Sequence, residues 1–216
     1  MIVSPSLYSM HFDRFKEEMD ALNSCVEWIH FDVMDAHFVP NLTFGPGICK
    51  TVRKNTELFL DVHLMVDDPE HYADVFAQAG ADSIVFHYEV FNDIEECKRL
   101  LNKIRGMYLK AGISIKPGTS IETIKPLLPY LDIFLLMSVE PGFGGQSFMP
   151  EALDRVKELS DYRKENGLDF IIEVDGGVSD KNAHDLLSRG ADALVAGSYV
   201  FNGDIRANVE KLRKCE

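Results

Sequence analysis

The chain has 216 residues, 46% of them hydrophobic and 26% charged, and a formal net charge of −13. This size and composition predict a soluble protein with one large core, so we expect a single domain over residues 1–216. The negative charge argues against non-specific binding to nucleic acids or anionic membranes, because both need a positive field. An anionic small ligand is compatible with it, since backbone amides can bind phosphate in an acidic protein.

The cysteines and the N-terminus indicate a reducing compartment. Cys25, Cys49, Cys97 and Cys215 have no C-x-x-C spacing, which favours free thiols. The first residues lack the basic and apolar regions of a signal peptide. No apolar run approaches the roughly 20 residues that span a bilayer. We therefore expect a cytoplasmic protein.

Short apolar runs alternate with amphipathic segments along the whole chain. Strands are predicted at residues 2–4, 28–33, 58–65, 83–87, 110–115, 131–138, 170–174 and 193–196. Helices are predicted at residues 11–23, 47–54, 69–78, 94–106, 121–128, 150–165, 181–188 and 205–213.

Eight such strand–helix repeats, about 25 residues apart, predict parallel βαβ units. They favour a (β/α)₈ TIM barrel, compact for a fold that typically needs about 250 residues. An open doubly wound sheet is the alternative. No G-x-G-x-x-G motif follows the first strand, which weakens a dinucleotide-binding version of that sheet.

Polar side chains recur on the second, third and seventh predicted strands. Side chains alternate along a strand, so His30 and Asp32 share one face, as do Asp61 and His63. Asp175 follows the seventh strand directly. Two imidazoles and two carboxylates, from His30, Asp32, His63 and Asp175, suit zinc, iron(II), cobalt or manganese. The alternative is that both histidines are structural and hydrogen-bond to carboxylates.

Glycine-rich segments follow the last three predicted strands, at residues 141–146, 176–177 and 197–198. TIM-barrel proteins frequently bind phosphate in the loops after strands seven and eight, where bare amides face the anion. One glycine pair would be weak support, because loops need glycine anyway. Three clusters at consecutive strand ends predict a phosphate site.

Other residues at strand ends have two readings each. Met34, Met65 and Met137 are either core filler or an apolar wall around a site. Ser6 either caps a helix or reaches a substrate hydroxyl. His87, at the end of the fourth predicted strand, and Glu89, just after it, have no evident role.

Taken together, these segments resemble the ribulose-phosphate 3-epimerases. The resemblance rests on residues 4–6, 30–35, 37–41, 63–66, 137–146, 173–177 and 197–198, which run from the first strand to the eighth. It implies a TIM-barrel isomerase of the pentose phosphate pathway that interconverts D-ribulose 5-phosphate and D-xylulose 5-phosphate through a cis-enediolate. It also implies one divalent metal ion per subunit and a homo-oligomer, either a dimer or a hexamer.

The resemblance assigns roles to individual residues. Asp32 and Asp175 would be the acid/base pair on opposite sides of C3, and the metal ligands would be His30, Asp32, His63 and Asp175. Ser6 and His63 would contact the substrate. The phosphate-binding segment would contain Gly142, Phe143, Gly144, Gly145, Gly176, Gly177, Gly197 and Ser198. The apolar lining of Met34, Met65 and Met137 would raise the pKa values of both acid/base carboxyl groups.

One position departs from the family pattern. The family usually has glycine after Met-Asp, where this chain has Ala36. If the position needs a positive φ, alanine costs on the order of 1 kcal/mol, and we expect altered loop behaviour with activity retained.

Three rival functions remain open at this point. The first is an epimerase of another ketose phosphate, such as D-allulose 6-phosphate. The second is a sugar-phosphate decarboxylase of the same superfamily, whose D-x-K-x-x-D signature would begin at Asp61 but meets His63 instead of lysine. The third is a non-catalytic sugar-phosphate-binding protein.

Overall fold

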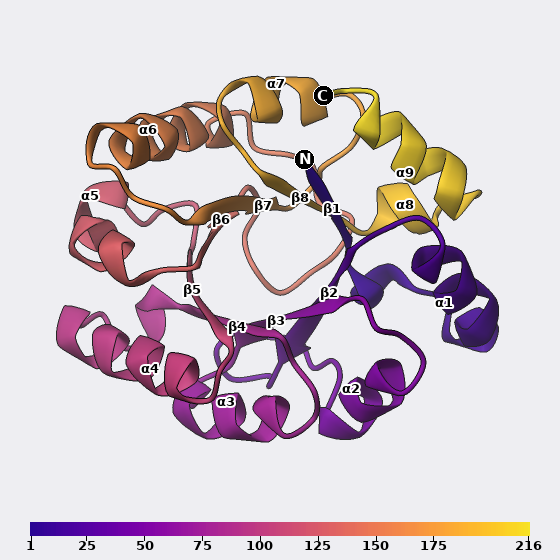
Figure 1. Ribbon diagram of the computed structural model, residues 1–216, viewed down its shortest axis with the longest axis horizontal. Coiled ribbons are helices and arrows are strands. Elements are labelled where there is room, and N and C mark those ends of the chain that lie inside the picture. The colour runs from indigo at the N-terminus through magenta and orange to yellow at the C-terminus, as the bar shows by residue number, and fades with distance from the viewer.

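The computed structural model describes residues 1–216 as one eight-stranded parallel sheet surrounded by helices (Figure 1). The strand order is β1-β8-β7-β6-β5-β4-β3-β2, and every ladder is parallel. An isolated parallel bridge between Ser6 and His30 joins β1 to β2. The bridge closes the sheet, so the predicted (β/α)₈ barrel is confirmed and the open doubly wound alternative is wrong.

All eight predicted strands and eight predicted helices are present. The strands are β1 (Ile2–Pro5), β2 (Trp28–Met34), β3 (Phe59–Met65), β4 (Ser83–His87), β5 (Lys110–Ile115), β6 (Ile133–Met137), β7 (Ile171–Asp175) and β8 (Ala193–Ala196). The helices are α1 (Phe15–Asn23), α2 (Pro46–Arg53), α3 (Pro69–Ala77), α4 (Ile94–Gly106), α5 (Ile121–Ile124), α6 (Ala152–Glu165), α7 (Ala183–Ser188), α8 (Ser198–Phe201) and α9 (Ile205–Arg213). None of these helices has the length and apolar composition needed to cross a membrane.

The differences from the predicted elements lie at their ends. Two 3₁₀ turns, Leu7–Ser9 and Phe12–Arg14, precede α1, so the first helix starts later than predicted. Helix α5 is a single turn followed by a 3₁₀ segment, Lys125–Tyr130, which contains two prolines that cannot donate helical hydrogen bonds. The short helix α8 was not predicted, because four residues are too few to show a helical period.

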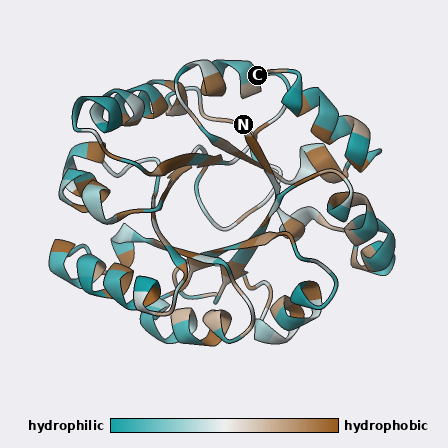
Figure 2. Cartoon of the chain, in the orientation of Figure 1, coloured by the Kyte–Doolittle hydropathy of each residue, from teal (hydrophilic) through white to brown (hydrophobic).

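The barrel has three separate hydrophobic clusters, of which the smallest is Met34, Val39 and Met65. A cluster of 54 buried residues fills the layer between the sheet and the surrounding helices, whose apolar faces turn inward (Figure 2). A smaller cluster inside the barrel contains Val85, Ile133, Leu135, Met137, Val139 and Val195. It comes from β4, β6 and β8, whereas β2 and β3 contribute fully buried histidines and carboxylates. The barrel interior is therefore polar at β2 and β3, where Glu173 of β7 joins His30 and Asp61, and largely apolar elsewhere.

A repeated ion pair fastens the end of the barrel opposite the carboxyl ends of the strands. An aspartate before β4, β6 or β8 accepts the backbone N–H at or near the start of the preceding strand and pairs with an arginine from the helix before that strand. The three pairs are Arg53–Asp82, Arg105–Asp132 and Arg163–Asp192. The matching segments Gly80-Ala81-Asp82 and Gly190-Ala191-Asp192 belong to this repeat. These contacts stabilise one barrel end and leave the other for function.

Ala36 lies in the loop after β2 with φ at 61°, the left-handed region that favours glycine. Its N–H donates to the carbonyl of Asn41, which holds the loop in this shape. This position, where the family usually has glycine, therefore does require a positive φ. Alanine pays a steric penalty of about 1–2 kcal/mol here.

The Ala36→Gly variant is expected to be more stable by about 1 kcal/mol, because relief of the steric penalty exceeds the added entropy of the unfolded chain. Urea unfolding measures this as a higher midpoint. The control is Ala207→Gly in α9, where glycine should lower stability by about 1 kcal/mol. A midpoint that falls in the Ala36→Gly variant would contradict the expectation.

Candidate active site

A pocket opens at the carboxyl ends of the barrel strands, where the sequence predicted the functional residues. Its walls come from the loops after β1, β6, β7 and β8 and from strand ends. Of the predicted site residues, those that line it are Ser6, Asp32, Met34, Met65, Met137, Gly142, Phe143, Gly144, Gly145, Asp175, Gly176, Gly177, Gly197 and Ser198. His30 and His63 are fully buried and adjoin the pocket through Asp32.

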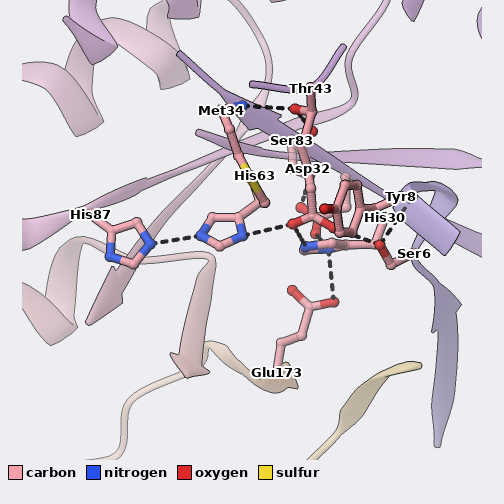
Figure 3. Close-up of polar contacts among 11 residues, drawn as sticks. Ser6, Tyr8, His30, Asp32, Met34, Thr43, His63, Ser83, His87 and Glu173 are labelled. Atoms are coloured by element: carbon pink, nitrogen blue, oxygen red, sulfur yellow. Dashed lines mark hydrogen bonds and ion pairs between the residues drawn. The ribbon is translucent and has the colours of Figure 1, made fainter. Parts of the chain in front are cut away.

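The four predicted metal ligands converge on one point. One ligand atom from each of His30, Asp32, His63 and Asp175 lies within 4.8 Å of the others. The Oδ1 atom of Asp32 is 3.3 Å from His30 Nε2 and 3.2 Å from His63 Nδ1 (Figure 3). Parallel neighbours β2 and β3 create this closeness, because their register places Asp32 beside His63 and His30 beside Asp61.

The partners of His30 decide which of its nitrogens faces this point. Nδ1 donates to Asp61 Oδ2 at 2.7 Å, and Asp61 is held in turn by the hydroxyl of Ser83. Nε2 is buried and makes no hydrogen bond. Burial opposes a charge on His30, but Asp32 and Asp61 outweigh it and raise the pKa of His30 well above its usual value. A cation, either a proton or a metal ion, is thus favoured between His30 Nε2 and Asp32, so the donor set fits a metal.

The two predicted acid/base carboxyl groups have opposite electrostatic environments. Burial by itself would raise the pKa of Asp32, but the adjacent ring of His30 outweighs it and lowers that pKa. Burial, with the nearby carboxylate of Asp32, raises the pKa of Asp175 to about 7. The expected upward shift therefore holds for Asp175 and is wrong for Asp32, because the ring of His30 adjoins Asp32.

Ser6 makes the predicted capping contact and a second, unpredicted contact with Asp32. Its hydroxyl donates to Asp32 Oδ2 at 2.5 Å, and its oxygen accepts the N–H of Tyr8, which caps the 3₁₀ turn after β1. The backbone of Asp32 is braced separately, because the hydroxyl of Thr43 donates to its carbonyl at 2.7 Å. Asp32 is thereby fixed in position before any ligand binds.

The glycine segments also form part of the pocket wall. The N–H groups of Gly177, Gly197 and Ser198 donate to no acceptor in the protein. At Gly176, φ is 120° and an added Cβ would lie 2.6 Å from the side chain of Val139; at Gly197 an added Cβ would lie 2.6 Å from Ser9 Oγ. Free amides in a wall too tight for side chains make a binding surface for an anion.

Several residues of the site were not assigned by sequence reasoning. Strand alternation placed Asp61 beside His63 without giving it a role, and Glu173 lies on the same strand face as Asp175, so the same alternation could have identified it. Tyr8 lines the pocket, and its hydroxyl accepts a hydrogen bond from Asn41, which also donates to the carbonyl of Gly142. That contact joins loops 101 residues apart in sequence, for which no local signal exists.

Sequence comparisons identify related proteins. The ribulose-phosphate 3 epimerase family matches residues 2–201. The chain is 47% identical over 203 residues to a ribulose-phosphate 3-epimerase of Synechocystis, covering 94% of this chain and 88% of that protein. It is 46% identical to the chloroplastic ribulose-5-phosphate-3-epimerase of Arabidopsis thaliana (93% and 72% covered) and 40% identical to a ribulose-phosphate 3-epimerase of Mycobacterium tuberculosis (94% and 87% covered).

Solved structures show the same fold at low sequence identity. A 3-hexulose-6-phosphate synthase from Salmonella typhimurium superimposes with a TM-score of 0.76 at 14% identity, covering 100% of this chain and 98% of that one. A 3-keto-L-gulonate-6-phosphate decarboxylase from Vibrio cholerae gives 0.73 at 15% identity, with 99% and 96% covered. These likenesses support the barrel fold alone.

Proposed function

This chain belongs to the ribulose-phosphate 3-epimerase family, and on that premise we propose that it inverts C3 of D-ribulose 5-phosphate to give D-xylulose 5-phosphate. It would act as an isomerase of the pentose phosphate pathway. The observation that carries this proposal is the meeting of Asp32 and Asp175 with two imidazoles on one point at the wall of a glycine-lined pocket. Inversion needs a proton removed from one face of C3 and another delivered to the opposite face, which two carboxyl groups can do.

The electrostatics of the pair support these roles. Asp32 is ionised and able to accept a proton, whereas the pKa of Asp175, at about 7, lets it hold one near neutrality. Enzymes that need an acid and a base separate the two pKa values in this way. The buried side chains of Met34, Met65 and Met137 line the same pocket and keep water away from the carboxyl groups.

The proposed cofactor is one divalent metal ion per subunit held by His30, Asp32, His63 and Asp175, with zinc, iron(II), manganese and cobalt all suited to the donor set. When bound, such an ion would act as a Lewis acid that stabilises negative charge on the enediolate oxygens. The protein supplies the two imidazole lone pairs, and Ser6 holds the second oxygen of Asp32.

Substrate binding is assigned to the glycine wall. The free amides of Gly177, Gly197 and Ser198 would bind the phosphate, which fixes the remote end of the substrate and orients C3. The loop at residues 142–145 would cover it, with Phe143 half exposed at 56%. Ser6 reaches the pocket surface and can contact a substrate hydroxyl, whereas the fully buried His63 would act on the substrate mainly through the metal.

Three further features stay predictions. We expect residues 1–216 to act as one catalytic domain, the subunits to assemble as a dimer or hexamer, and the protein to work in the cytoplasm.

Solvent deuterium exchange tests the proposed reaction. In D₂O with ribulose 5-phosphate, NMR should show deuterium at C3 of both epimers, because each carboxyl group exchanges its proton with solvent. Removal of the metal with a chelator should abolish the exchange, and added divalent metal should restore it. Brisk exchange of allulose 6-phosphate without exchange of the pentulose would instead identify the hexulose epimerase. Binding of either sugar phosphate without any exchange would indicate the non-catalytic alternative.

A further inference from the structure

His87 and Glu89 form a buried chain of hydrogen bonds that ends on His63. The Nε2 atoms of His63 and His87 are 2.9 Å apart, and His87 Nδ1 is 3.2 Å from Glu89 Oε2 (Figure 3 shows the first contact). Both imidazole rings are fully buried, and the side chain of Glu89 is 13% exposed. The chemistry proposed above gives no part to His87 or Glu89, and neither lines the pocket.

We propose that His87 and Glu89 are positioning residues that fix the tautomer of His63. They keep its Nδ1 lone pair facing the proposed metal site beside Asp32. The inference rests on the proposed metal site. It adds two residues that hydrogen-bond, directly or in sequence, to the ring nitrogen of His63 on the side away from the metal.

Glu89 determines which atom carries the proton in each hydrogen bond of this series. Its Oε1 accepts the backbone N–H of Lys116 at 2.7 Å and the hydroxyl of Thr119 at 2.5 Å. Burial alone would raise the pKa of Glu89, but these partners and His87 lower it to about 2. Glu89 is therefore an ionised acceptor, and His87 must donate to it from Nδ1.

A neutral imidazole has one N–H and one lone pair, so the remaining assignments are forced. Both rings are fully buried, which favours their neutral forms, and the two Nε2 atoms at 2.9 Å have room for only one proton between them. With its proton on Nδ1, His87 presents a lone pair at Nε2. His63 must then donate from Nε2, which leaves the lone pair on Nδ1, 3.2 Å from Asp32 Oδ1, so that a metal ion between these two atoms would bind both.

The two histidine ligands thus use opposite nitrogens. His30 donates from Nδ1 to Asp61 and presents Nε2, whereas His63 donates from Nε2 to His87 and presents Nδ1. Each histidine is backed by a carboxylate. Asp61 contacts His30 directly, whereas Glu89 acts on His63 through the ring of His87. Carboxylates placed behind metal-binding histidines fix the ring and increase its basicity.

The Glu89→Gln variant tests the inference, because it reverses the direction of these hydrogen bonds while keeping the shape of the side chain. The glutamine carbonyl must stay on the Lys116 N–H, which turns the amide NH₂ toward His87 Nδ1. His87 then donates from Nε2, and His63 is forced to carry its proton on Nδ1. Long-range ¹H–¹⁵N NMR of the metal-free protein at pH 8 should show His63 protonated on Nε2 in the wild type and on Nδ1 in the variant.

Metal affinity provides a second readout, measured with cobalt(II) or zinc(II) in competition with a chelator. Glu89→Gln should weaken binding about 10- to 100-fold. His87→Gln should stay within a few-fold of wild type, since Glu89 holds the new amide NH₂ and the carbonyl accepts from His63. The exposed Glu57→Gln carries the same charge change and should alter neither readout.

A wild-type His63 protonated on Nδ1 would overturn the inference, as would unchanged metal affinity in a folded Glu89→Gln variant. If Glu89→Gln does not fold, the wild-type tautomer and the His87→Gln affinity still decide the question. Failure of the metal site itself would look different: the wild-type protein would bind no cobalt or zinc, while the NMR spectra would still report the tautomer of His63.

Discussion

The Asp175→Asn variant is expected to lose about 10²- to 10⁴-fold in turnover, because the amide cannot hold or release the proton that a general acid or base transfers. Asparagine has the same shape, and Asp175 carries a raised pKa from burial and from the Asp32 carboxylate, so the fold should tolerate the loss of its charge. The rate of ribulose 5-phosphate epimerisation measures the effect, and thermal unfolding verifies the fold.

The matched control for this variant is Asp169→Asn, which removes the same charge from an exposed position before β7. It should keep the wild-type rate. A near-normal rate in Asp175→Asn would remove Asp175 from the acid/base pair. Loss of metal in that variant would assign its effect to ligation instead, so the bound metal is measured in the same samples.

The His30→Leu variant is expected to abolish stoichiometric metal binding and to lower the free energy of unfolding by about 3 kcal/mol. The first effect follows from loss of a ligand, and the second from leaving the buried Asp61 carboxylate without the imidazole that donates to it at 2.7 Å. Metal content by elemental analysis and urea unfolding of the metal-free protein measure the two effects separately.

A double variant separates ligation from stability. His30→Leu combined with Asp61→Leu removes both partners, which should recover most of the lost stability but none of the metal. His71→Leu on the exposed surface of α3 is the control and should change neither quantity. Stoichiometric metal in the double variant would show that His30 is not a ligand.

The fold was predictable because its signals are local and repeated. Each strand is an apolar run bounded by turn residues, and eight alternations leave few topologies for a chain of this length. The failures have local causes too. The 3₁₀ turns before α1 and the single-turn α8 are shorter than the period that identifies a helix, and prolines end α5 early.

The candidate site was predictable to the extent that strand ends carry it. His30, Asp32, His63 and Asp175 could be grouped from the sequence, since carboxyl ends of parallel strands meet at one end of a barrel. The protonation states of these residues could not be predicted from the sequence, because they depend on neighbours on other strands. Asp32 and Asp175 both follow apolar strand residues, yet the adjacent His30 lowers the pKa of Asp32 and burial raises the pKa of Asp175.

The sequence by itself determined the barrel, the residues at its carboxyl end and the glycine segments at Asp175-Gly176-Gly177 and Gly197-Ser198, because strand period and turn chemistry are written in neighbouring residues. Only the tertiary structure decided which nitrogen of each histidine faces the metal point. It also decided that Glu89 lies behind His63, and that Ala36 adopts a left-handed conformation. The histidine contacts depend on hydrogen bonds between strands more than 20 residues apart, whose register no local pattern records.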